Sequence, residues 1–181
     1  REPGSQTGFA YISHLLRVIV PAATAFFFLP YLTGERFPIM DSHIRASFLG
    51  LSQDTSAADM AGSVLEGVAF SIRHGLELFN HPAVKLSIIG GGARELAWCQ
   101  ILSNVMAFLS TSTKTGPAAC TCYRIQRFLS RRHYPGLPVF IHVLEEKGGC
   151  TVLNPNPDAV KAYEPVYRKY KTIYPMVCDF T

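Results

Sequence analysis

Apolar residues along the chain fall into two kinds of pattern. Short runs rich in β-branched and aromatic residues predict buried strands over residues 26–32, 84–89 and 109–113. Helical spacing of apolar residues predicts one helix from about residue 56 to 79 and another from 93 to about 108. Strands that alternate with helices in this way are typical of a layered α/β domain.

The longer helical pattern has a clear start and contains three glycines. Ser56 followed by Asp59 is typical of a capping box, in which each side chain bonds the other residue's backbone N–H. The glycines inside the pattern are Gly62, Gly67 and Gly75. Each costs roughly 1 kcal/mol relative to alanine, so we expect another backbone to pack closely there. Glu66 lies between two of them; such a residue is more often a solvated or capping carboxylate than a catalytic one.

A further helix is predicted near the end of the chain. Asn156 and Pro157 form a typical helix start. Four tyrosines then recur at helical spacing: Tyr163, Tyr167, Tyr170 and Tyr174. An aromatic stripe of this kind usually packs against the domain body. Pro165 interrupts it and predicts a kink or a later start of the helix.

The turn Gly90-Gly91-Gly92-Ala93 joins the second predicted strand to a helix. Such a turn leaves backbone N–H groups unpaired at the positive end of the helix, a geometry that accepts phosphate. It lacks the Gly-Lys-Ser/Thr of a P-loop, and a dinucleotide fingerprint would need a glycine at Glu95. A tight connection without any ligand is the alternative interpretation, since glycine is the default residue of sharp turns.

Composition narrows the classes of function. The chain has 181 residues, 48% of them hydrophobic, and a net charge of +4, too mild to indicate a nucleic-acid binder. Its longest apolar run, residues 18–32, is shorter than the ~20 residues of a membrane span and contains Pro21. The first residues, Arg-Glu-Pro-Gly, resemble no signal peptide, and the missing initiator Met suggests a piece of a longer protein.

The five cysteines form no regular framework, which favours free thiols and a cytoplasmic location. Cys120, Cys122, His133 and His142 lack the paired spacing of a zinc site, so no metal site is expected from them. Because the net charge is mild and the longest apolar run is too short for a membrane span, we expect neither a nucleic-acid partner nor a membrane partner.

Three ordered motifs carry a family resemblance. The first reads Leu-Pro-Tyr-Leu-Thr-Gly-Glu-Arg over residues 29–36, with Pro38 two residues on. The second joins residues 46–51 to residues 59–70 across a spacer of seven residues, and the third is the glycine turn followed by Trp98 and Gln100. Together they resemble the C-terminal half of the FGGY carbohydrate kinases, most closely the xylulokinase branch.

The resemblance implies a fold and an activity. Members are ATP-dependent sugar or polyol kinases whose two actin-like, ribonuclease-H-like domains close over a cleft. The expected reaction is transfer of the γ-phosphoryl of ATP to a sugar hydroxyl, foremost of a xylulose-like ketose, with Mg²⁺. The sugar pocket and the general-base aspartate belong to the N-terminal domain, so no catalytic residue is expected here. That missing domain is the expected partner, and the isolated chain is expected to be inactive.

The resemblance also assigns residues. The nucleotide-contacting residues would be Gly90, Gly91, Gly92 and Ala93, with Glu95 as a weaker addition. Glu35 and Arg36 would either face the cleft or staple their own loop, and Glu66 is a second-rank cleft candidate. Residues 1–25 would be a remnant leading segment, 26–132 the nucleotide-binding domain, and 133–181 a divergent extension with a terminal helix.

The chain departs from the family pattern in two places. Gly62-Ser63 stand where the family usually has Arg-Ala, and Cys120-Thr121-Cys122 stand where it has Gly-Ala-Ala. A reading-frame slip and real divergence both explain the second departure. Two rival interpretations are a non-catalytic kinase remnant and a nucleotide-binding module that pairs with a separate N-terminal half.

Overall fold

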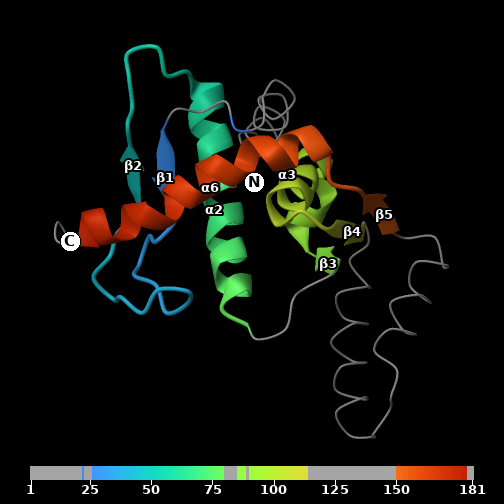
Figure 1. The fold of residues 1–181 in the computed structure, drawn as a ribbon, viewed down its shortest axis with the longest axis horizontal. Coiled ribbons are helices and arrows are strands. Elements are labelled where there is room, and N and C mark those ends of the chain that lie inside the picture. Colours follow the sequence, from blue (N-terminus) through green and yellow to red (C-terminus); the bar gives the residue numbers. More distant parts are fainter. Residues whose placement is uncertain (1–21, 23–25, 80–84, 89, 114–149, 179–181) are drawn as a thin grey trace, which may run out of the picture.

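The computed structural model describes residue 22 and residues 26–79, 85–88, 90–113 and 150–178. Within them, two small sheets flank a long central helix, and a C-terminal helix crosses over it (Figure 1). The central helix is α2 (Ala57–Glu77) and the crossing helix is α6 (Pro157–Val177). Helices and strands therefore form one layered arrangement, as the alternation of patterns predicted.

The first sheet is a pair of three-residue strands. In it β1 (Phe27–Leu29) pairs antiparallel with β2 (Ser47–Leu49). Phe27 and Leu29 are buried and Phe28 is half-buried, which is the alternation expected of a strand with one covered face. The strand at β1 was predicted. The strand at β2 was missed, because its three residues are not part of a longer apolar run such as the one that contains β1.

The second sheet has the order β3-β4-β5. Strand β3 (Lys85–Ile88) runs parallel to β4 (Leu109–Thr113), and β4 runs antiparallel to β5 (Cys150–Leu153). The parallel pair requires a crossover, which helix α3 (Leu96–Met106) supplies. The predictions of β3 and β4 are confirmed; β5 was not predicted.

Helix α2 starts as its sequence signal predicted. The Asp59 N–H donates to Ser56 Oγ (3.2 Å), and the Ser56 N–H donates to Asp59 Oδ2 (3.0 Å). Close packing at its glycines is confirmed at Gly67, where a Cβ would clash with the backbone carbonyl oxygen of Phe28 in β1. At Gly75 the close neighbour is instead a side chain, the ring of Phe37.

Helix α6 starts at Pro157 and continues through Pro165, so the prediction of a late start is wrong. Asn156 caps it, with Oδ1 accepting from the N–H groups of Asp158 (2.9 Å) and Ala159 (3.3 Å). The predicted packing of the tyrosine stripe is confirmed: three rings lie within 5.2–5.9 Å of the Phe70 ring of α2, those of Tyr163, Tyr167 and Tyr170.

Polar contacts join the layers as well. The Arg73 guanidinium of α2 donates to Glu164 of α6 at 2.8 Å and to the Val105 carbonyl of α3 at 3.1 Å. From α3, Ser103 Oγ donates to the Leu153 carbonyl at the end of β5 (3.1 Å). Residues 150–178 thus share the sheet and the core of residues 26–113. The predicted domain boundary at 132/133 lies outside the described residues.

Candidate functional site

The glycine turn follows β3 but does not lead directly into an α-helix. Residues Gly91–Arg94 form a short 3₁₀ helix, and α3 begins at Leu96, three residues later than predicted. The Ala93 N–H donates to the Gly90 carbonyl (3.3 Å) and the Glu95 N–H donates to the Gly92 carbonyl (3.1 Å). These i→i+3 bonds tighten the turn, and the extended backbone of Glu95 (φ −94°, ψ 99°) ends it before α3 begins.

The three glycines lie at an open surface. All are exposed, and a Cβ built on Gly90 or Gly91 would meet no atom within 4 Å. Gly90 has a φ of +93°, which side-chain-bearing residues rarely adopt. Within the described part of the chain, no group accepts the N–H of Gly91 or Gly92. The turn therefore presents bare backbone donors to an open space, which suits an anionic ligand.

The start of α3 adds to this set of donors. Glu95 is the N-cap residue, yet its side chain makes no capping hydrogen bond. The first helical bond runs from the Cys99 N–H to the Glu95 carbonyl (3.1 Å). The N–H groups of Leu96 to Trp98 therefore lie at the positive end of the helix, with no acceptor among the residues described here.

The five predicted nucleotide residues differ in how far they are exposed. Gly90, Gly91 and Gly92 face open space, whereas the Ala93 side chain is completely buried in the core. Ala93 thus offers no side-chain surface to a ligand, and its N–H is bonded inside the turn. Glu95 is half-buried at the junction of the turn and α3. Trp98, which was not among the predicted site residues, lies against Gly92.

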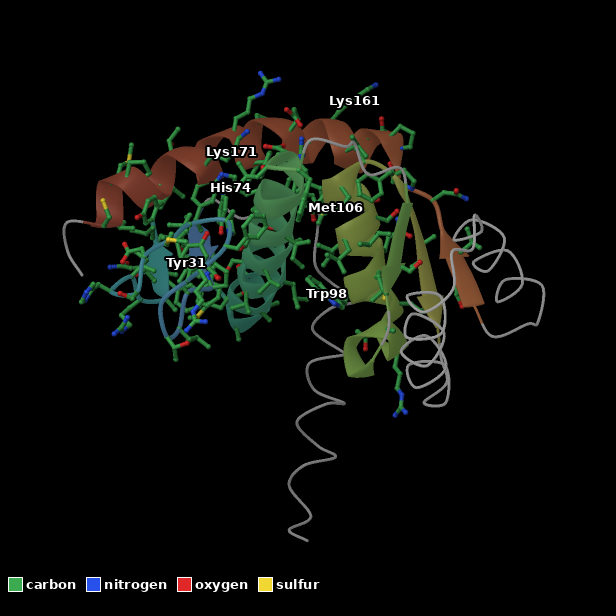
Figure 2. The ribbon with its side chains drawn as sticks, turned by 90° about the horizontal axis from the view of Figure 1, so that it is seen from below. Tyr31, His74, Trp98, Met106, Lys161 and Lys171 are labelled. Atoms are coloured by element: carbon green, nitrogen blue, oxygen red, sulfur yellow. The ribbon has the colours of Figure 1, made fainter. Side chains whose placement is uncertain are left out.

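Glu35 and Arg36 lie in a different part of the molecule. Their loop, residues 34–46, and the glycine turn lie on opposite sides of α2 in both views (Figures 1 and 2). Glu35 staples its own loop, because its Oε1 accepts the N–H groups of Arg36 (2.8 Å) and Phe37 (3.1 Å). Its backbone also pairs with Asp41 in both directions, at 2.8 and 2.9 Å.

The same loop, together with Thr33, borders an open hollow of about 710 Å³. Seven residues line it: Thr33, Gly34, Glu35, Arg36, Met40, Asp41 and Ser42. Asp41 accepts N–H groups from His43 (2.8 Å) and Ile44 (3.1 Å), and the bond from His43 is the main reason that its pKa lies below 3.8, its ordinary value. The Glu35 side chain therefore holds its own loop through hydrogen bonds, and both Glu35 and Arg36 border an open concavity.

Glu66 is buried in the core and not solvated. Its side chain is 2% exposed. Its Oε1 accepts the Tyr163 hydroxyl of α6 (2.9 Å) and the Ala22 N–H (3.0 Å). Burial and, after it, the Glu66 carboxylate raise the pKa of Tyr163 above its ordinary value of 10.0. The carboxylate thus joins three distant segments of the chain.

The described residues give no indication of a metal-binding cluster. Among them, no three His, Cys, Asp or Glu side chains are placed to hold an ion. Cys120, Cys122, His133 and His142 lie outside the described residues. Of the helices in the described ranges, none has the length and apolar character needed to cross a bilayer.

Comparison with known proteins connects this geometry to a family. The sequence model that describes the C-terminal domain of the FGGY family of carbohydrate kinases matches residues 14–121 of this chain. The chain belongs to the FGGY family of carbohydrate kinases. Its α/β architecture is that of the family's actin-like ATPase fold, which confirms the predicted fold class.

Individual relatives agree with this assignment. A xylulose kinase of Staphylococcus epidermidis is 30% identical over 168 residues, which is 88% of this chain and 32% of the relative. The crystal structure of a Rhodospirillum rubrum xylulose kinase superposes with a TM-score of 0.76 at 19% identity, over 98% of this chain and 36% of that one.

A third comparison involves a bound nucleotide. Plasmodium falciparum glycerol kinase, solved with ADP, superposes with a TM-score of 0.71 at 18% identity, over 92% of this chain and 33% of that one. The present chain therefore spans about a third of the length of these kinases.

Proposed function

We propose that this chain forms the nucleotide-binding side of an ATP-dependent sugar kinase. In this proposal the complete enzyme transfers the γ-phosphoryl of ATP to a sugar hydroxyl. The observation that carries it is the exposed glycine turn, where the N–H groups of Gly91 and Gly92 have no acceptor within the described residues. Family membership supports the choice of a nucleotide as the ligand.

The chemistry of phosphoryl transfer fits such a turn. Catalysis rests on positioning the phosphates and stabilising their charge, and preorganised backbone donors do both. Gly90 and Gly91 leave room for a phosphate to approach the backbone, because no atom lies within 4 Å of their Cβ positions. Mg²⁺ would accompany the phosphates of ATP. The described residues offer no cluster of carboxylates for the ion, so we assign it no step here.

The sugar and the base belong to the remainder of the proposed enzyme. A xylulose-like ketose is the proposed acceptor, since the relative at 30% identity is a xylulose kinase. The general base would be an aspartate of an N-terminal domain, which is the proposed partner of this chain. Glu35 and Arg36 are secondary candidates for the cleft, since both border the hollow of the 34–46 loop. Glu66, also a cleft candidate from the sequence, is not proposed again, because its side chain is buried and bonded to Tyr163 and Ala22. A cytoplasmic location is proposed with this function.

Thermal unfolding with ATP and Mg²⁺, combined with an assay of sugar phosphorylation, tests the proposal. A ligand at 100 times its Kd stabilises the folded state by about 2.7 kcal/mol, so we expect a clear rise in Tm at millimolar nucleotide. We expect no phosphorylation of xylulose by the chain alone, because in this proposal the general base belongs to the N-terminal domain. Turnover by the isolated chain would contradict this division of roles.

The same experiment separates the two rival functions. An unchanged Tm at millimolar nucleotide would favour a non-catalytic remnant and would overturn the proposal. A rise in Tm without phosphorylation, even after a kinase N-terminal domain is supplied, would favour a nucleotide-binding module. The exposed donors of Gly91 and Gly92 favour both binding functions over the remnant.

A further inference from the structure

Trp98 of α3 lies directly against the glycine turn. Its Nε1 is 3.3 Å, and its Cδ1 3.4 Å, from the position that a Cβ on Gly92 would occupy. The edge of the indole that carries the N–H therefore faces the turn. Figure 2 shows Trp98 on the side of α3 that faces α2. Glycine at position 92 thus makes room for the indole as well as for the turn.

The indole N–H has no acceptor among the described residues, although the ring is half-buried and packs against the core. Indole Nε1–H is a donor only, and among the described residues the Trp98 N–H is not one of the fully buried polar atoms that lack a partner, so a group from outside can reach it. The backbone N–H groups of Gly91 and Gly92, in the turn that the indole faces, also have no acceptor among the described residues. Three neighbouring donors with no protein acceptor fit one acceptor-rich group from outside.

We infer that the Trp98 indole N–H donates to a phosphate oxygen of the nucleotide held by the glycine turn. This inference rests on the proposed function and adds a side-chain donor to its backbone donors. Phosphate fits because each of its oxygens accepts several hydrogen bonds and its charge strengthens them. The phosphate chain, and not the nucleoside, is the part of the ligand that Trp98 contacts.

Trp98 is the only tryptophan of the chain, so its intrinsic fluorescence reports this contact directly. The three probes are ATP with Mg²⁺, tripolyphosphate and adenosine. We expect ATP and tripolyphosphate to change the emission of Trp98 and adenosine to leave it unchanged. An emission change with adenosine but none with tripolyphosphate would place the nucleoside at the indole and overturn the inference.

A variant separates donation from packing. Trp98→Phe keeps an aromatic ring but removes the N–H, and loss of a hydrogen bond to a charged acceptor lowers affinity roughly tenfold or more. We expect that loss for ATP by calorimetry. Tyr174→Phe is the matched control. Tyr174 lies on α6, and its hydroxyl donates to Asp41 Oδ2 at 3.1 Å. The variant also removes one aromatic hydrogen-bond donor, and it should leave the affinity for ATP unchanged.

The outcomes distinguish this inference from the function on which it rests. If the wild-type chain binds neither ATP nor tripolyphosphate, both are overturned. If the wild-type chain binds ATP and folded Trp98→Phe binds it equally well, the indole only packs, and the inference alone is overturned. Thermal unfolding without ligand shows whether the variant is folded.

Discussion

Helix α2 and strand β1 approach each other closely at Gly67, and adding a single methyl group there tests this packing. A Cβ at this position would clash with the Phe28 carbonyl oxygen and would lie 3.1 Å from the Phe28 carbonyl carbon. Both are backbone atoms of a strand that is paired with β2. The Gly67→Ala variant can therefore fold only if α2 and β1 move apart.

The expected cost follows from two opposing effects. Overpacking of a well-packed core typically costs 1–3 kcal/mol. Alanine in place of a helical glycine returns up to about 1 kcal/mol. Because the clash at Gly67 is with backbone atoms, which cannot rotate away, the overpacking cost should lie at about 2–3 kcal/mol. The net loss of unfolding free energy for Gly67→Ala should then be about 1–2 kcal/mol.

Gly75→Ala in the same helix is the matched control. Its Cβ would lie 2.7 Å from Phe37 Cε1, an atom of a side chain that is 49% exposed and can shift more cheaply than backbone. The helix gain should then dominate, so we expect no loss of stability. Urea unfolding of the wild type and both variants measures the difference. Equal unfolding free energies for Gly67→Ala and the wild type would refute the close approach.

Three further perturbations have defined outcomes. Glu66→Ala leaves the buried Tyr163 hydroxyl without its acceptor and should lower the free energy of unfolding by about 1–3 kcal/mol; an unchanged urea midpoint would contradict this. Asn156→Ala removes the cap of α6 and should cost about 1 kcal/mol. The folded-state pKa of Asp41 is depressed, so its stabilisation exists above pH 3.8 and is lost as pH falls through the folded value. When the pH falls from ~6 into the acid range, the free energy of unfolding in urea should therefore decrease more for the wild type than for Asp41→Asn. Equal decreases would contradict the lowered pKa of Asp41.

The sequence predicted those features of the fold that depend on neighbouring residues. Ser56 and Asp59 are three residues apart, and the cap that they form was predicted from their identity alone. The cap of α6 at Asn156 is equally local. The glycine turn was found because three consecutive glycines after a buried run are unusual without a structural reason.

Features that depend on distant partners could not be predicted in this way. Glu66 has the spacing of a solvated helix residue, and its burial depends on Tyr163, which lies 97 positions later. Strands β2 and β5 have three and four residues, and each is defined by pairing with a remote strand. The later start of α3 depends on bonds inside the turn, which composition does not reveal.

The candidate site shows the same division. The exposure of Gly90, Gly91 and Gly92 agrees with the anion-binding geometry predicted for their turn. The separation of Glu35 and Arg36 from that turn by α2 could not be predicted, because sequence motifs carry no information about which side of a helix a loop occupies. The proximity of Trp98 to Gly92 depends on the turn's own geometry and was missed for that reason.

Binding of ATP with Mg²⁺ to the Gly91→Val variant tests the central claim most directly. Gly91 is better suited than Gly92, where a larger residue would also displace the Trp98 indole. A Cβ at Gly91 meets no atom within 4 Å, so the fold should persist while the side chain blocks the approach of a phosphate. Calorimetry should show at least a tenfold loss of ATP affinity relative to the wild type, with Gly75→Ala unchanged. Wild-type affinity in folded Gly91→Val would contradict a nucleotide site at this turn.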